Sequence, residues 1–219
     1  MTIEAIIFDC DGTLVDSLPI ATEVLVEYLA ELGVTLSARD VAARFGAGRL
    51  AKIIADFENF LGHQLPADFV PEFRRRRSQA VRQRLRPIEG AADLLRDLQL
   101  PIAVASNGPL EQTLLSLETT GLLQYVSGKV FSAYELDTWK PDPEIFLHAA
   151  RALGVQPSRC AVVEDAIPGV EAGIAAGMTV FAFCEHDRWN SERVHVIRRL
   201  DEIRRHLAAT AGSARPTAR

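Results

Sequence analysis

The sequence has few cysteines, no long apolar run and no excess of basic residues. No apolar stretch approaches the roughly 20 residues that a membrane helix needs, and the chain opens on a strand pattern without a basic leader. The cysteines are odd in number and widely spaced, which gives a disulfide framework no support. They are Cys10, Cys160 and Cys184. We expect a soluble, cytoplasmic protein without a membrane partner.

Positive charge is also limited, because the net charge is -5 and the pI is acidic. Nucleic acids are held mainly by clustered lysine and arginine, so this balance argues against a nucleic-acid partner. The one basic run, Arg74 to Arg77, falls in a helical pattern whose consecutive residues point around the helix. We interpret it as a solvated helix surface.

Apolar composition and periodicity predict an α/β fold. Hydrophobic residues make up 48% of the chain, which is enough for a buried core. Short apolar runs alternate with helical patterns, as in βαβ units, and this predicts a Rossmann-like parallel sheet covered on both faces. The expected strands are Ile3 to Phe8, Ile102 to Ala105, Lys129 to Phe131, Cys160 to Val163 and Met178 to Phe183. In such sheets ligands bind beyond the carboxyl ends of the strands.

One interval breaks this alternation, because the chain between the first two expected strands contains only helical patterns. These are Pro19 to Leu32, Ala38 to Phe45, Arg49 to Leu61 and Asp68 to Leu85. We interpret the interval as a helical cap inserted into the core. The expected division is a core of 1–17 and 87–207, a cap of 18–86 and a flexible tail of 208–219. The chain length fits one core with a smaller insertion.

The first expected strand ends in two acids, Asp9 and Asp11, followed by Gly12 and Thr13. Two carboxylates at a strand exit repel each other unless a cation lies between them. Gly12 is free to adopt unusual dihedral angles, and Thr13 adds a hydroxyl donor. A lone Asp-Gly usually only caps a turn, so the second acid is what points to chemistry here.

Three more polar segments follow later strands. Each has an ordinary interpretation by itself, as a helix cap, an exposed loop residue or an acidic cap. They are Ser106-Asn107-Gly108-Pro109, Lys140 before Pro141, and Glu164-Asp165 before Gly169, Gly173 and Gly177. All lie at or just past the carboxyl side of the predicted sheet, where they can converge. Together they supply acids, a hydroxyl and an ammonium, which can hold a divalent cation and a phosphate at once.

These four segments resemble the four motifs of the haloacid dehalogenase-like phosphatases, over nearly the whole chain. The inserted helices resemble the cap of the phosphoglycolate-phosphatase-like branch. Within that branch, segments 106–109 and 139–143 and Phe183-Cys184 are most similar to the bacterial 6-phosphogluconate phosphatases. The chain departs from the usual pattern at Trp139, where glycine normally precedes the motif lysine.

The resemblance implies hydrolysis of small phosphorylated metabolites in two steps. Asp9 is implied as the nucleophile that becomes an aspartyl phosphate, and Asp11 as the acid and then the base. The resemblance assigns phosphate binding to Thr13, Ser106, Asn107 and Lys140. It implies Mg²⁺ as cofactor, held by Asp9, by Asp165 and by the backbone carbonyl of Asp11, with Glu164 acting through water.

The cap contributes one candidate for substrate selection, Arg49, which follows a glycine-containing turn near the start of an expected helix. A cation at a helix N-terminus is disfavoured by the helix dipole, which suggests an anionic partner. A solvated arginine is the other interpretation. If the cap closes as in the resembling phosphatases, Arg49 can pair with a substrate carboxylate, favouring acidic sugar phosphates such as 6-phosphogluconate.

Alternatives to a phosphatase stay open on the sequence alone. A sugar phosphomutase shares the core and differs mainly in how its cap excludes water from the intermediate. A non-catalytic binding module could keep the same fold, although acids in both halves of the site speak against it. The sequence is compatible with a monomer or a small homo-oligomer.

Overall fold

A computed structural model describes residues 2–45, 50–126, 128–185, 188–189 and 191–212 of the chain. Within them, six strands form one parallel sheet in the order β3-β2-β1-β4-β5-β6. The strands are β1 (Ala5–Phe8), β2 (Ile102–Ser106), β3 (Val130–Ser132), β4 (Cys160–Glu164), β5 (Thr179–Phe183) and β6 (Val194–Ile197). The predicted α/β fold with a parallel sheet is confirmed.

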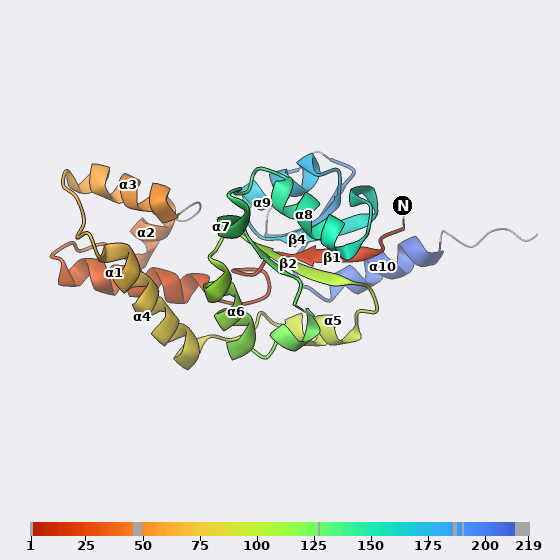
Figure 1. Ribbon diagram of the computed structural model, residues 1–219, viewed down its shortest axis with the longest axis horizontal. Coiled ribbons are helices and arrows are strands. Elements are labelled where there is room, and N and C mark those ends of the chain that lie inside the picture. Colours follow the sequence, from red (N-terminus) through yellow and green to blue (C-terminus); the bar gives the residue numbers. More distant parts are fainter. Residues whose placement is uncertain (1, 46–49, 127, 186–187, 190, 213–219) are drawn as a thin grey trace, which may run out of the picture.

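The helices fall into a cap group and a core group (Figure 1). The cap group is α1 (Leu18–Glu31), α2 (Ala38–Phe45), α3 (Leu50–Leu61) and α4 (Phe69–Arg84). The core group is α5 (Ala91–Asp97), α6 (Leu110–Thr119), α7 (Ala133–Leu136), α8 (Glu144–Leu153), α9 (Ile167–Ala175) and α10 (Glu202–Gly212). Two short 3₁₀ helices, η1 (Leu123–Tyr125) and η2 (Pro157–Arg159), precede β3 and β4.

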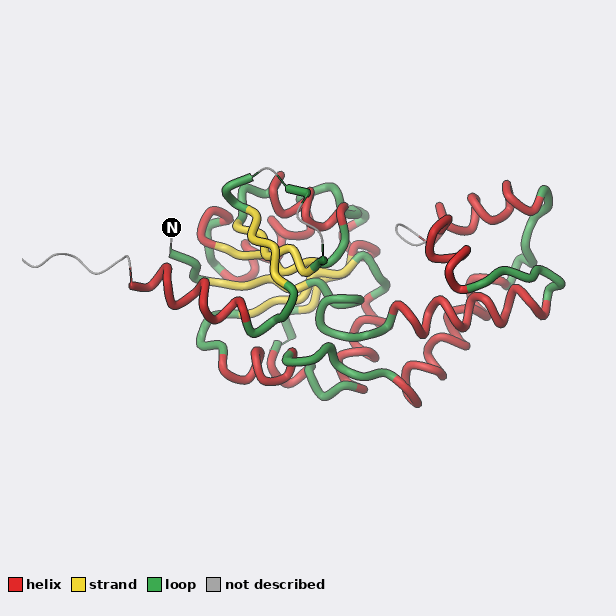
Figure 2. The backbone as a smooth tube through the Cα atoms, turned by 180° about the vertical axis from the view of Figure 1, so that it is seen from behind, coloured by secondary structure: helices red, strands yellow, loops and turns green. Residues whose placement is uncertain are grey.

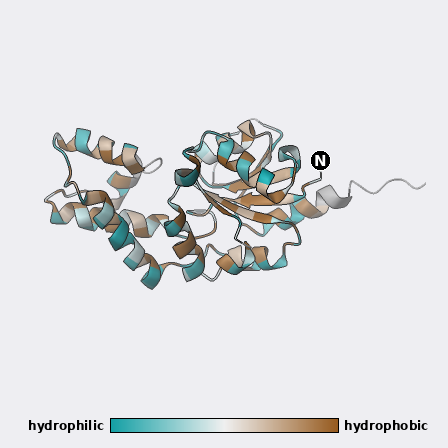
Figure 3. Ribbon diagram, in the orientation of Figure 1, coloured by the Kyte–Doolittle hydropathy of each residue, from teal (hydrophilic) through white to brown (hydrophobic). Residues whose placement is uncertain are grey.

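The two faces of the sheet carry two separate apolar clusters because side chains alternate along each strand. Ile6 and Phe8 of β1 pack with residues of α5, α6 and α10 on one face. Ala5 and Ile7 pack with residues of α8 and α9 on the other. Figure 3 shows the strands as a hydrophobic layer between helices. Burial on both faces explains why these strands read as continuous apolar runs.

The cap helices form a separate group beside the core, and Figure 2 shows all the described strands in the core. Tyr28 of α1 stacks on Phe69 of α4, with ring centroids 4.7 Å apart. The chain leaves and re-enters the core at neighbouring points, because Val15 pairs with Pro87 and the Asp16 N–H donates to the carbonyl of Arg86 at 3.0 Å. This geometry supports a cap inserted between 17 and 87.

Some elements differ from the sequence expectations. Strand β6 (Val194–Ile197) was not predicted, because its first three residues are only partly buried and include a histidine. Helix α10 continues to Gly212, past the expected start of the tail at 208, and 213–219 lie outside the described residues. The described helices include none long and apolar enough to cross a membrane.

Candidate active site

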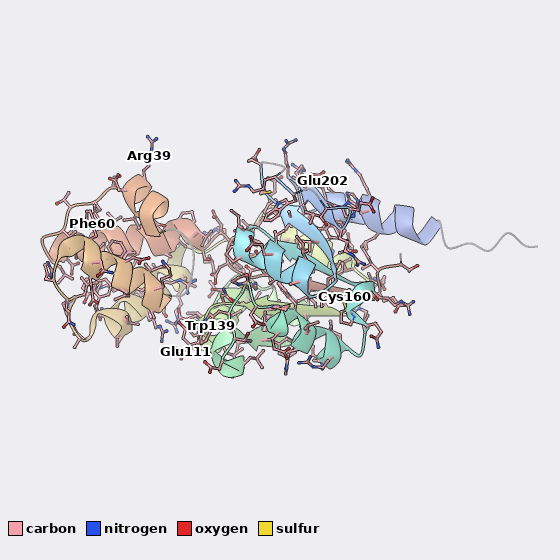
Figure 4. All side chains as sticks on the ribbon, turned by 90° about the horizontal axis from the view of Figure 1, so that it is seen from above. Arg39, Phe60, Glu111, Trp139, Cys160 and Glu202 are labelled. Carbon is pink, nitrogen blue, oxygen red and sulfur yellow. The ribbon has the colours of Figure 1, made fainter. Side chains whose placement is uncertain are left out.

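The carboxyl end of β1 lies between the carboxyl ends of β2 and β4. Phe8, the last residue of β1, is in register with Val104 of β2 and with Val163 of β4. The polar residues that follow therefore meet at one edge of the sheet. In Figure 4, Trp139 and Glu111 lie on the side of the core that faces the cap, whereas Cys160 at the start of β4 lies away from it. The site is at the cap-facing edge.

Gly12 permits the two acidic segments to approach each other closely. Its φ is 91°, in the region that favours glycine. A Cβ on Gly12 would lie 2.3 Å from Oδ2 of Asp165, closer than any side chain could tolerate. The hydroxyl of Thr13 then donates to Oδ1 of Asp165 at 2.9 Å. The glycine expected to take unusual dihedral angles therefore brings β1 and β4 residues together.

Lys140 is the central cation of the site. Its Nζ donates to Oδ1 of Asp9 at 2.5 Å, to Oε1 of Glu164 at 2.6 Å and to the carbonyl of Ala105 at 2.8 Å. Its side chain is only 2% exposed. The backbone N–H of Lys140 donates to Oδ1 of Asn107 at 3.0 Å, which ties the lysine loop to the segment after β2. Four separate segments thus meet around one ammonium.

The buried acids of the site outnumber the lysine beside them. Burial raises the pKa of Asp9 well above its usual range; Lys140 opposes the shift, while Glu164 and Asp165 add to it. Burial, with the Glu164 charge, raises the pKa of Asp165 to about 6. Burial disfavours the charged form of Lys140, but Asp9 and Glu164 outweigh it and leave the lysine pKa raised. The site has an excess of negative charge that a further cation would relieve.

Both carboxylate oxygens of Glu164 accept hydrogen bonds from the protein. Its Oε1 accepts from Lys140, and its Oε2 accepts from the N–H of Ala166 at 2.9 Å. A Cβ on Gly169 would lie 1.8 Å from Oε1, so glycine is needed for the carboxyl to fit against α9. Among the described residues, no three acidic, histidine or cysteine side chains converge as ligands of an ion. The charge of Asp165, which follows β4, raises the pKa of Asp9, which follows β1, so these two acids lie near one another.

The end of β2 presents a hydroxyl and leads into a tight turn. Ser106 is buried, and its Oγ accepts from the N–H of Gly108 at 3.0 Å. Ser132, the last residue of β3, donates to the carbonyl of Gly108 at 2.7 Å. Because the Ser106 oxygen accepts one hydrogen bond in this turn, its own proton stays available for a phosphate oxygen.

Asp11 lies two residues after Asp9 in sequence but has different partners. Its Oδ1 accepts from the hydroxyl of Ser17, where the chain enters the cap, and from Nη2 of Arg77 at 2.7 Å. The interpretation of the whole basic run as a solvated surface is wrong for Arg77, whose side chain is 13% exposed. Helical spacing could have revealed this, because Phe73 and Val81 lie four residues to either side and are buried.

Two further residues concern the site, Arg49 of the cap and Cys10 of the core. Arg49 lies outside the described residues. Cys10 lies between the two acids but is fully buried, and burial, with the charges of Asp11 and Asp9, raises the pKa of its thiol. A raised pKa makes the reactive thiolate scarce, which agrees with a structural role for Cys10.

Comparisons with known proteins agree with this geometry. The family model for haloacid dehalogenase-like hydrolases matches residues 3–177. The chain is 39% identical over 196 residues to 6-phosphogluconate phosphatase of Escherichia coli strain K12, covering 88% of this chain and 87% of that protein. It is 32% identical over 188 residues to hexitol phosphatase A of the same strain, covering 83% of each.

A solved structure gives the same result. A haloacid dehalogenase-like protein of unknown function from Agrobacterium tumefaciens strain C58 superposes with a TM-score of 0.80 at 31% identity, covering 95% of this chain and 99% of that one. Of the alternatives that the sequence left open, the named relatives support a phosphatase. The chain belongs to the haloacid dehalogenase-like hydrolases and is a phosphatase of that family.

Proposed function

We propose that this phosphatase hydrolyses sugar phosphates, 6-phosphogluconate among them, through an aspartyl phosphate on Asp9. The observation that carries the proposal is the buried Asp9 carboxylate at a strand end, 2.5 Å from Lys140 and beside a second acid with separate partners. The proposed division is a core of 1–17 and 87–207, a cap of 18–86 and a tail of 208–219. We place the protein in the cytoplasm.

In the first proposed step, an oxygen of Asp9 forms a bond to phosphorus while the bond to the leaving sugar oxygen breaks. Asp11 gives its proton to that oxygen, so the sugar departs as an alcohol. In the second step, a water oxygen bonds to phosphorus, and the bond to Asp9 breaks. The water proton passes to Asp11, and inorganic phosphate leaves. Together, the two steps return the enzyme to its initial state.

The residues around Asp9 suit the charge that develops on the phosphoryl group. Lys140 is held in place by three acceptors, so its ammonium needs no rearrangement during the reaction. The hydroxyl of Ser106, the last residue of β2, lies at the same edge of the sheet. Thr13 and Asn107 complete the proposed phosphate site. Such donors stabilise charge most strongly where water is excluded.

The donor set also fits Mg²⁺, which usually binds one or two carboxylates, substrate phosphate and water. Asp9 and Asp165 would hold it with the backbone carbonyl of Asp11, and Glu164 would contribute through water. The raised pKa values of Asp9 and Asp165 support this, because burial and the neighbouring carboxylates disfavour their charged forms, which a cation between them would favour. When bound, the ion supplies the charge that lets an ionised Asp9 face an anionic phosphate.

Chelation tests the metal. We expect EDTA to remove turnover of 6-phosphogluconate and Mg²⁺ in excess to restore it, because an unshielded Asp9 would repel the substrate. Initial rates of phosphate release, with the protein dialysed against EDTA and then titrated with Mg²⁺, provide the measurement. Full activity in EDTA would contradict the metal assignment, whereas a wild-type enzyme inactive on every sugar phosphate with Mg²⁺ would contradict the function itself.

Arg49 is the proposed selector of acidic substrates, and the relative that acts on 6-phosphogluconate supports the same substrate class. We expect Arg49→Ala to lower the selectivity for 6-phosphogluconate over glucose 6-phosphate by roughly one to two orders of magnitude, through loss of a charge-assisted hydrogen bond. The measurement is kcat/KM for both substrates side by side. An unchanged ratio would remove Arg49 from the specificity site.

A further inference from the structure

Arg77 occupies a position on α4 that faces the core. It follows Phe73 by one turn and precedes Val81 by one turn, and both of these residues are buried. Its side chain is 13% exposed, compared with 63% for the neighbouring Arg75, which pairs with Glu72 on the same helix. A guanidinium placed on the buried face of a helix needs a specific partner, because burying an unpaired charge is costly.

The partner of Arg77 belongs to the core and to the proposed chemistry. Its Nη2 donates to Oδ1 of Asp11 at 2.7 Å, and the hydroxyl of Ser17 donates to the same oxygen. The other carboxylate oxygen, Oδ2, lies near Gly108, since it would be 3.6 Å from a Cβ placed on that glycine. One oxygen of Asp11 thus accepts from Arg77 of the cap and from Ser17, where the chain enters the cap, while the other lies near Gly108, just after β2.

Arg77 is itself held in position by a contact between cap and core. The Nε2 of Gln112, on α6, donates to the hydroxyl of Ser78 at 2.9 Å, and the Gln112 side chain is buried. The Nη1 of Arg77 points to Oε1 of the same glutamine at 3.4 Å. This contact joins α4 to α6, and Figure 1 shows these helices side by side where the cap meets the core. The guanidinium therefore reaches Asp11 from a cap that lies against α6.

We propose that Arg77 is a positioning residue of the reaction, which holds Oδ1 of Asp11 so that Oδ2 faces the leaving oxygen of the substrate. The inference rests on the proposed function, because it assigns Arg77 to the acid of that mechanism. Arg77 comes from the cap and Asp11 from the core, so the contact requires the cap to be seated on α6. Proton transfer is thereby coupled to the position of the cap.

The test compares substrates whose leaving groups differ in their need for a proton. In Arg77→Ala we expect kcat for a sugar phosphate to fall roughly ten- to a hundred-fold, the effect of losing one charge-assisted hydrogen bond. We expect kcat/KM for p-nitrophenyl phosphate, which excludes hydrolysis of the aspartyl phosphate, to fall less than about three-fold, because that leaving group needs little protonation. KM should change little for either substrate. Added methylguanidinium should restore part of the lost sugar-phosphate rate.

Arg75→Ala is the matched control, since it removes an arginine from the same helix without touching Asp11. Arg77→Lys retains the charge without the planar fork and should give an intermediate loss; it also decides the question if Arg77→Ala does not fold. Equal losses with both substrates, a change confined to KM, or no loss beyond that of Arg75→Ala would overturn the positioning role. A wild type that hydrolyses neither substrate would overturn the proposed function and this inference with it.

Discussion

We expect Asp9→Asn to abolish turnover and to prevent formation of a phosphoenzyme. The amide has nearly the size of the carboxylate, and its oxygen can still accept from Lys140, so the fold and the lysine position are expected to persist. An amide is not a competent nucleophile, and removing a nucleophile lowers kcat by roughly four to six orders of magnitude. Phosphate release from a sugar phosphate gives the rate, and hydroxylamine-sensitive incorporation of labelled phosphate detects the intermediate.

Asp11→Asn is the companion variant, because it alters the neighbouring acid without removing the nucleophile. It should lose most turnover with sugar phosphates, whose alkoxide is a poor leaving group, and recover part of it with an activated aryl phosphate. Asp9→Asn should recover nothing with either substrate. If both variants recovered equally on the aryl phosphate, the two acids would not have the separate roles that their different partners indicate.

Most residues at the active-site edge of the sheet could be predicted from the sequence, because the carboxyl ends of neighbouring parallel strands lie at the same edge. Asp9, Ser106 and Glu164 each lie at the end of an apolar run, and the register of β1 with β2 and β4 places those ends together. The glycine at position 12 was also informative, because a positive φ and a close approach by Asp165 both require it. Local sequence patterns suffice to predict such residues, because the parallel topology brings the strand ends together.

The partners of each carboxylate could not be read in the same way. Arg77 contacts an acid 66 positions away in the sequence, and this contact depends on how the cap sits on α6. The four arginines of the run look alike in sequence, and only their spacing from buried Phe73 and Val81 separates Arg77 from Arg75. The structure pairs the carboxylate of Glu164 directly with Lys140, a contact that the sequence pattern did not indicate. Such pairings depend on side-chain directions across several elements.

We expect Lys140→Met to destabilise the folded protein and also to remove most of its activity. The lysine lies between Asp9 and Glu164 with 2% of its side chain exposed, and methionine keeps much of its length and apolar stem. Taking away one partner of a buried ion pair leaves an uncompensated buried charge. The free energy of unfolding should fall by about 3 to 5 kcal/mol, and kcat/KM should fall at least about a hundred-fold with the loss of a fixed cation.

The pH of this measurement follows from the direction of the lysine shift. The folded pKa of Lys140 is raised above its ordinary value, because Asp9 and Glu164 outweigh burial. A raised lysine pKa contributes stability that is fully present below the unfolded pKa and is lost as pH rises through the folded pKa. The full loss is therefore expected near pH 7. Urea unfolding in EDTA measures it without a divalent ion that could compensate.

Two further variants separate loss of the ion pair from loss of a lysine as such. Lys129→Met removes a partly buried lysine whose ammonium donates to the carbonyl of Ala152 at 3.2 Å, and it should cost about 1 kcal/mol or less. Adding Glu164→Gln to Lys140→Met removes one of the stranded carboxylates, so the double variant should be more stable than Lys140→Met alone. A Lys140→Met protein as stable as the wild type, or a double variant no better than the single one, would show that these carboxylates do not depend on Lys140 for their burial.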